Sequence, residues 1–356
     1  MAAIELPIKL QGMHGSPYTR KMLALLRYRR LPYRFIVDFP QNPKLPGNGP
    51  ERASLPIPKV PLLPTFYFKD DNGTIEAATD STPIIRRLEQ AFSERSVIPS
   101  HPVSSFINYL IEDYADEWLT RCMFHYRWSR QKDIDKAATM LPLSGRVDLT
   151  EQELKNLAQH FAERQIGRLQ VVGSNETTAP VIEASYRRFL KLMEAHLSQA
   201  QFLFGSRPAS ADLALMGQLT SLSHFDPTPS QLCEQYAPRV YAWVDWLEDL
   251  SGYEIEENAW NPATDLPNTV VDILAEIAQT HMPQILANGR AVLAGEKRFE
   301  TEIGGLAWEQ PSFPYQLKCL NWTREAFAVL SDQDQLAVRN ILKTAGLLPI
   351  IDEAIS

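Results

Sequence analysis

The alternation of apolar and polar residues divides this chain of 356 residues into an α/β part and a longer helical part. Short apolar runs at residues 7–11, 33–37 and 65–68 are typical of strands. A helical spacing of apolar residues follows the first run, and Asn72-Gly73 is a strong signal for a hairpin turn. The first part is therefore predicted to hold a parallel strand pair, a hairpin and flanking helices.

Beyond residue 101 the apolar residues recur with helical spacing. Helices are predicted at 102–118, 149–172, 181–197 and 236–250 in this region, and at 266–286, 315–330 and 332–344 further on. A short strand is predicted at 299–303. The domain organisation expected from this pattern is an α/β domain at 1–94, an all-helical domain at 101–251, and a mainly helical extension at 252–356 that packs on the helical domain.

The segment 59–83 carries the most chemistry. If the Val60-Pro61 bond is cis, the backbone of Val60 turns outward and can pair with a peptide-like ligand. Asp80-Ser81 precedes a predicted helix, so an acid and a hydroxyl stand at a helix N-terminus, where a ligand carboxylate is favoured. A free backbone edge at one end and an anion-binding helix N-terminus at the other would fit a short anionic peptide.

Composition narrows the functional classes. The apolar content of 44% and charged content of 22% are ordinary for a globular protein, and no apolar run is long enough to cross a membrane. Three widely spaced cysteines and the absence of a signal-peptide pattern predict a reducing, cytoplasmic location. The net charge of −8 argues against nucleic acid and anionic membranes as partners, although residues 1–90 carry 13 Lys/Arg against 8 Asp/Glu.

An acidic face on the first long helix raises a second possibility. Carboxylates and a histidine are common metal ligands, and this region holds Glu112, Asp113, Asp116, Glu117 and His125. The second histidine unit of a di-metal bundle is missing, so we expect no metal. The aromatic residues of the same region predict either core packing or an apolar substrate pocket lined by Tyr114, Trp118 and His125.

The order of these motifs resembles that of the glutathione S-transferase family over about residues 5–250. The resemblance implies a thioredoxin-like N-terminal domain, an all-α second domain, glutathione as co-substrate, and a homodimer. In the family a Val-Pro step holds the cysteine part of glutathione, matched here by Val60-Pro61. An acid-Ser pair holds its γ-glutamyl end, matched by Asp80-Ser81.

Ser16-Pro17-Tyr18 resembles the tau-like Ser-Pro-aromatic motif, which implies that Ser16 stabilises the glutathione thiolate. The omega-like branch has Cys in that slot, so thiol–disulfide transfer is disfavoured. Tyr18 is the alternative hydroxyl donor. Lys44 and Lys59 are candidate partners for a ligand carboxylate.

The chain departs from the family pattern at a buried capping box of the second domain. Asp212 is present, but the N-cap slot three residues earlier holds Ala209 in place of Ser or Thr. Half of the reciprocal capping is lost, worth about 0.5–2 kcal/mol, and Ser210 is a possible substitute.

The leading functional hypothesis is an enzyme that activates glutathione for attack on a small apolar electrophile. One alternative is a non-catalytic binding or scaffold protein that keeps the fold. Another is a different glutathione-dependent reaction, such as ether cleavage, isomerisation or peroxide reduction. A metal-dependent hydrolase is the remote option.

Overall fold

The structure is a computed structural model that describes residues 4–37, 54–256, 259–262 and 266–355. Its N-terminal part is a four-stranded sheet in the order β2-β1-β3-β4. The β1 and β2 strands are parallel, and the β1–β3 and β3–β4 pairs are antiparallel. The strands are β1 (Ile8–Gly12), β2 (Tyr33–Val37), β3 (Thr65–Lys69) and β4 (Ile75–Ala78).

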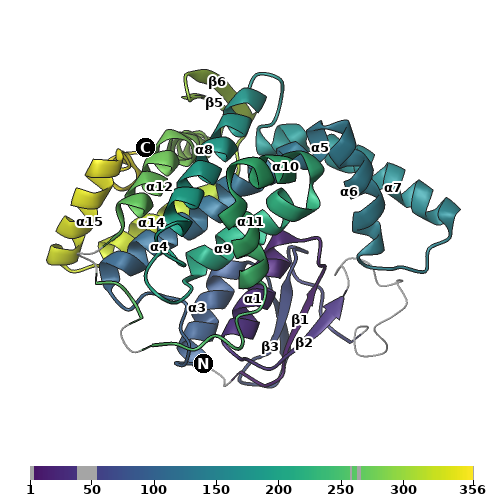
Figure 1. The fold of residues 1–356 in the computed structure, drawn as a ribbon, viewed down its shortest axis with the longest axis horizontal. Helices are drawn as coiled ribbons and strands as arrows, with labels where there is room; N and C mark the ends of the chain where they lie inside the picture. Colours follow the sequence, from purple (N-terminus) through teal and green to yellow (C-terminus); the bar gives the residue numbers. More distant parts are fainter. Residues whose placement is uncertain (1–3, 38–53, 257–258, 263–265, 356) are drawn as a thin grey trace.

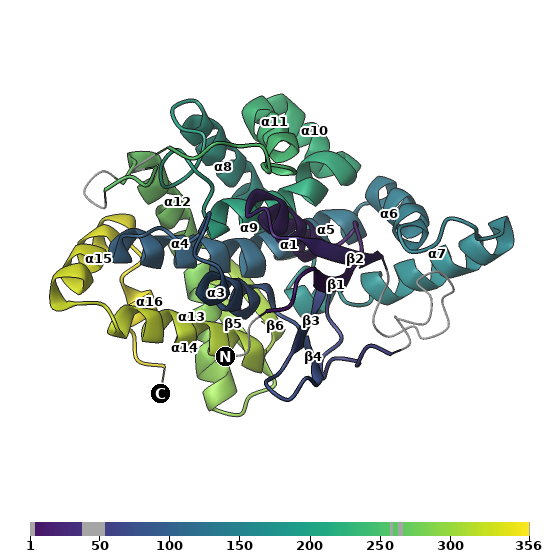
Figure 2. The same cartoon turned by 90° about the horizontal axis from the view of Figure 1, so that it is seen from below.

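Two helices belong to this sheet, α1 (Pro17–Tyr28) between β1 and β2 and α3 (Ser81–Ala91) after β4. Both lie between the sheet and the helical part of the molecule (Figures 1 and 2). The predicted hairpin turn is confirmed, because the Asp70 amide donates to the Thr74 carbonyl and Gly73 has a φ of 79°. That left-handed conformation is easy for glycine.

The helical part is a bundle built around α9, all of whose residues are buried. Its elements are α4 (Pro102–Tyr114), the π-helical turn η1 (Ala115–Leu119), α5 (Thr120–Ser129), α6 (Gln131–Leu143), α7 (Glu151–Ile166), the 3-10 turn η2 (Leu169–Val172), α8 (Ala179–Leu197), α9 (Ser210–Leu219), the π-helical turn η3 (Thr220–Phe225), α10 (Pro227–Tyr236) and α11 (Pro238–Leu247).

The α1 and α9 helices cross at close range because α9 has a glycine at the crossing. A Cβ on Gly217 would lie 2.7 Å from the carbonyl oxygen of Pro17 and 3.0 Å from the Cβ of Lys21. This contact joins the α/β part to the helical bundle beside the first turn of α1, next to the site described below.

The C-terminal extension forms a layer on the same bundle (Figure 1). Its elements are α12 (Asn268–Gln279), α13 (His281–Leu293), β5 (Arg298–Ile303), β6 (Leu306–Pro311), α14 (Pro314–Ala328), α15 (Asp332–Ala345) and α16 (Pro349–Asp352). The α12 helix packs on α8, and α14 and α15 pack on α4. The Arg188–Glu276 ion pair of 2.6 Å, in which Glu276 is buried, ties α12 to α8.

Local signals fixed several ends of these helices. Ser331 caps α15 as predicted, its hydroxyl accepting from the Asp334 amide at 3.2 Å, and Gly346 ends the helix with a φ of 72°. Asp212 accepts from the amides of Ala209 and Leu203, which is the half of the capping box that the sequence retains. Within the described residues, no helix combines the length and apolarity needed to cross a membrane.

Candidate functional site

Ser16 is the N-cap of α1, as predicted. Its Oγ accepts from the Thr19 amide at 3.3 Å, and its own amide donates to the Met13 carbonyl at 3.0 Å. Pro17 follows at the first helical position. A partly exposed hydroxyl therefore stands at the positive end of the α1 dipole, where an anion such as a thiolate is stabilised.

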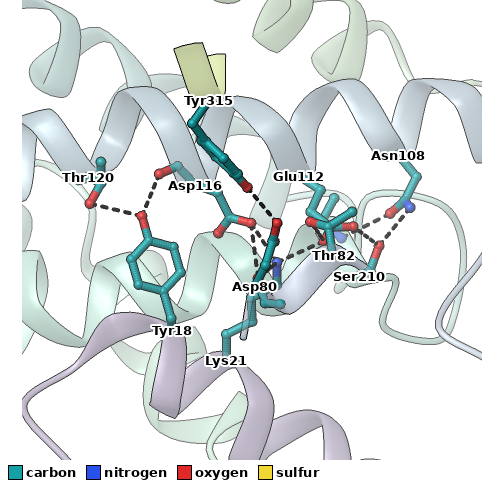
Figure 3. A network of polar contacts seen from close by, with 12 residues as sticks. Tyr18, Lys21, Asp80, Thr82, Asn108, Glu112, Asp116, Thr120, Ser210 and Tyr315 are labelled. Carbon is teal, nitrogen blue, oxygen red and sulfur yellow. Dashed lines mark hydrogen bonds and ion pairs between the residues drawn. The ribbon is translucent and has the colours of Figure 1, made fainter. Parts of the chain in front are cut away.

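Tyr18 points away from that position into the helical bundle. Its hydroxyl donates to the Asp116 carbonyl at 2.7 Å and lies 3.3 Å from Thr120 Oγ1 (Figure 3). Burial, followed by Glu117 and Asp116, raises the pKa of Tyr18 well above its ordinary value. Tyr18 therefore links the α/β part to the helical bundle. Its hydroxyl is already bonded there, which contradicts the alternative that Tyr18 is the catalytic hydroxyl.

Asp80 is the N-cap of α3 and Ser81 is the first residue of the helix. Figure 3 shows Asp80 between Lys21 and Tyr315. Asp80 has φ 80° and ψ 111°, a conformation that costs an L-residue energy and is frequent at functional sites. Ser81 is buried and Asp80 is partly exposed. The Tyr315 hydroxyl, from the extension, donates to Asp80 Oδ2 at 2.8 Å.

A buried lysine contacts the Asp80-Ser81 pair through Ser81. Lys21 of α1 is 1% exposed, and its Nζ donates to Ser81 Oγ at 3.1 Å, Glu112 at 2.8 Å and Asp116 at 2.7 Å. Glu112 also accepts from Thr82 at 2.9 Å. This network joins α1, α3 and α4/η1 (Figure 3), and the sequence interpretation missed it because a lysine in a helix usually faces water.

Burial and charge act against each other in the network. Burial lowers the pKa of Lys21, but Asp116 and Glu112 more than offset it, so the net change is upward. Burial raises the pKa of Glu112 and Lys21 lowers it, with a net decrease. Burial raises the pKa of Asp116 to about 7 although Lys21 opposes it. Glu112 of α4 and Asp116 of η1 therefore share the Lys21 ammonium, and burial opposes the charge of each acid.

Ser210 is drawn into the same network and does not replace the missing capping serine. Its hydroxyl donates to Glu112 at 2.6 Å and accepts from Asn108 at 2.8 Å. The side-chain oxygen of Asn108, Oδ1, accepts from the Ala211 amide at 2.9 Å. The α9 N-terminus is thus satisfied by side chains of α4, and the expected substitution by Ser210 is wrong.

The segment before β3 differs from expectation. Among the described residues the cis peptide bonds are Leu6-Pro7 and Leu63-Pro64, so the Val60-Pro61 bond is not cis and the condition set for an outward-turned Val60 backbone is not met. Pro64 is buried directly before β3, whereas Val60 is 53% exposed and Lys59 is exposed. Lys44 lies outside the described residues.

The predicted substrate pocket is also corrected. Tyr114 and Trp118 are fully buried, and Trp118 Nε1 donates to Ser185 at 2.7 Å. His125 is 2% exposed between Ser174 and Glu183. These side chains pack in the core, where the indole of Trp118 meets Trp308 of the extension at 5.5 Å between ring centroids.

The carboxylates that were considered as metal ligands each bind a different partner and do not converge on one point. Glu112 and Asp116 pair with Lys21, Asp113 pairs with His281 at 2.8 Å, and Glu117 accepts from Gln316 at 2.9 Å. In the part of the chain that the structure describes, no group of three or more His, Cys, Asp or Glu is placed to hold a metal ion.

The loop that carries Ser16 packs on the end of α6. A Cβ on Gly15 would meet Leu141 Cδ2 at 2.4 Å and Ser144 Oγ at 3.6 Å. A Cβ on Gly145 would lie 3.3 Å from Met13 Cε. Leu141 of α6 and Met13 of the loop are therefore the apolar side chains of this contact, which helix periodicity alone does not predict.

Two family models match the chain. The model described as glutathione S-transferase, N-terminal domain, matches residues 10–96, and the model described as glutathione S-transferase, C-terminal domain, matches residues 152–250. Together the matches span just over half of the sequence. They include Ser16, Asp80 and Ser81, and they leave out the extension. No curated protein matches the chain.

Solved structures with similarity to this chain share little sequence with it. A GST-like protein from Pseudomonas syringae is 18% identical, with 67% of this chain and 66% of that chain covered and a TM-score of 0.42. The beta-etherase LigF from Sphingobium sp. is 18% identical, with 68% and 95% covered and a TM-score of 0.45. A glutathione S-transferase from Methylobacterium radiotolerans, in complex with glutathione sulfonate, is 16% identical, with 69% and 92% covered and a TM-score of 0.39.

Proposed function

We propose that this chain, which belongs to the glutathione S-transferase family and has its thioredoxin-like and helical domains, binds glutathione at the N-termini of α1 and α3. The observation that carries the proposal is the Asp80-Ser81 pair, with its positive-φ acid. The γ-glutamyl group of glutathione has one ammonium and one carboxylate. Asp80 would bind the ammonium, and Ser81 with the α3 N-terminus would bind the carboxylate.

The spacing along α1 supports a single tripeptide site. Ser16 and Lys21 are five residues apart in sequence, which is about 7.5 Å of helix. Lys21 Nζ in turn contacts Ser81 Oγ at 3.1 Å. An extended tripeptide spans about 10 Å. Because Lys21 of α1 contacts Ser81, the helix that begins at Ser16 lies against the start of α3. We therefore place the γ-glutamyl end of the ligand at Ser81 and its thiol toward Ser16, with its backbone along residues 59–63.

Ser16 would activate the thiol. A free thiol has a pKa of about 8.5 and is mostly protonated at neutral pH. The Ser16 hydroxyl and the α1 dipole favour the thiolate, and the proton leaves to solvent. The sulfur then attacks the electrophilic carbon, a C–S bond forms, and the leaving group departs with its electron pair. Serine cannot form a mixed disulfide, so the proposed reaction is transfer.

We place the electrophile against the end of α6. Leu141 contacts the Gly15 position, and Met13 contacts the Gly145 position. Leu141 is 8% exposed and packs beneath the loop, whereas Met13 is partly exposed, so Met13 is the apolar side chain that a co-substrate beside the α1 N-terminus would contact. Met13 takes the place of the core aromatics that the sequence suggested.

The test is glutathione-dependent turnover of an activated aryl chloride. Met13→Ala is expected to raise KM for the aryl chloride and to leave KM for glutathione unchanged. Leu336→Ala, at an exposed position of α15, is the matched control and is expected to change neither. If glutathione binds but no turnover occurs with an aryl chloride, an aryl ether or a hydroperoxide, the transferase proposal fails and a binding role remains.

A further inference from the structure

One contact brings the extension to the proposed glutathione site. Tyr315 and Asp80 are 235 positions apart in sequence, and the Tyr315 hydroxyl donates to Asp80 Oδ2 at 2.8 Å (Figure 3). A tyrosine phenol has a pKa of about 10, so it keeps its proton at neutral pH and acts as the donor. Tyr315 is 42% exposed, so this contact lies at an accessible part of the surface.

The contact leaves Asp80 able to bind a second donor. An ionised carboxylate has about four acceptor positions on its two oxygens. The Tyr315 hydroxyl uses Oδ2, and the backbone of Asp80 is held at φ 80°. Both features restrict where the carboxylate points. A ligand ammonium would add a charge-assisted hydrogen bond to a group that is already oriented.

Tyr315 is itself held in place. It lies in the first turn of α14, which packs on α13, α4 and α16. The next residue, Gln316, is 6% exposed, donates to Glu117 at 2.9 Å and accepts from Gln284 at 2.9 Å. The α14 N-terminus is therefore anchored to η1 and α13, which favours a fixed wall over a mobile cover.

We propose that Tyr315 is a positioning residue of the glutathione site, supplied by the extension, which orients the Asp80 carboxylate toward the γ-glutamyl ammonium. The inference rests on the proposed function and adds a specificity element to it. Tyr315 acts through Asp80, so its effect depends on the presence of both the carboxylate and the ligand ammonium. The extension thereby completes the binding site as well as covering the bundle.

The experiment is calorimetric titration of the full chain with two ligands. One is reduced glutathione, and the other is glutaryl-cysteinylglycine, which lacks only the amino group. Tyr315→Phe removes only the hydroxyl and is expected to weaken glutathione binding about three- to tenfold, the range for one hydrogen bond. Binding of the analogue is expected to stay unchanged.

Two controls separate positioning from a structural effect. Tyr236→Phe changes a tyrosine of α10 with similar exposure, 43%, and is expected to bind both ligands like the parent. In a double-variant cycle, Asp80→Asn with Tyr315→Phe is expected to bind glutathione no more weakly than Asp80→Asn alone.

Each other outcome overturns a defined statement. Equal weakening of both ligands would mean a general distortion, and tighter glutathione binding would mean that Tyr315 obstructs the site. Either result, or no change, rejects the positioning role while the proposed function stands. A folded parent that does not bind glutathione rejects the proposed function and this inference with it.

Discussion

Lys21 of α1 and Glu112 of α4 form a buried ion pair of 2.8 Å across the boundary between the α/β part and the helical bundle. The side chains are 1% and 3% exposed. Asp116 completes the group at 2.7 Å from the same Nζ. The same ammonium contacts Ser81, so a buried group of charges between the two domains lies next to the proposed site.

Removal of the lysine charge should destabilise the fold strongly. Lys21→Met would leave two buried carboxylates without their counter-ion, and breaking such a pair typically costs about 3–5 kcal/mol. Chemical denaturation measures the free energy of unfolding. Lys69→Met is the matched control, because Lys69 pairs with Glu5 at 2.8 Å on the surface and should change stability by less than about 1 kcal/mol. Equal effects of the two changes would contradict the account.

The raised pKa of Asp116 predicts a pH dependence. Its value of about 7 exceeds that of an unfolded aspartate, about 3.9. The native state therefore binds more protons than the unfolded state between these values, so this group's contribution to stability falls as pH rises from about 4 to 7. Unfolding of the parent and of Asp116→Asn is compared over that range. The parent should lose stability relative to the variant as pH rises, and a relative gain would refute the assignment.

Gly217 should be intolerant of a side chain. A Cβ there would lie 2.7 Å from the Pro17 carbonyl oxygen, which is backbone and cannot move alone. Gly217→Ala is expected to force α1 and α9 apart and cost about 1–3 kcal/mol. Gly252→Ala, where no atom lies within 4 Å of the added Cβ, serves as the control. An unchanged thermal midpoint for Gly217→Ala would disagree with the helix crossing described.

Ser16 should affect the thiol more than ligand affinity. Ser16→Ala is expected to lower kcat/KM by about 10- to 100-fold, the loss of a hydrogen bond to a charged group, with glutathione affinity largely kept. Ultraviolet absorbance of the bound thiolate as a function of pH should show a higher thiol pKa in the variant. Ser16→Thr keeps a hydroxyl and a helix cap, so its thiol pKa should stay near that of the parent. A parent-like profile for Ser16→Ala would move the role elsewhere.

Local signals in the sequence predicted most of the fold. The Asn72-Gly73 turn, the Ser16 cap and the Ser331 cap with Gly346 all involve neighbours within a few residues, and each is found where expected. The β6 strand was missed. The side chains of Trp308 and Gln310 that turn inward are too few to mark a strand without its partner β5.

The site was predicted only in part because its key contacts are long-range. Tyr315 reaches Asp80 across 235 positions. Lys21 is buried against Glu112 of α4 and Asp116 of η1, which lie more than 90 positions away. Conversely, Tyr114 and Trp118 are aromatic residues of the kind that often line a pocket, but both are buried in the core. Helix periodicity identifies an apolar face and does not say whether another helix covers it.

The most direct test of the central claim is calorimetric titration of the folded parent with reduced glutathione, beside an Asp80→Asn, Ser81→Ala double variant. Circular dichroism would establish that both proteins are folded. Saturable one-site binding by the parent, weakened at least about tenfold in the variant, is the predicted result, since charge-assisted hydrogen bonds would be lost. Absence of binding by the parent, or equal binding by the variant, would contradict the proposal that this pair holds glutathione.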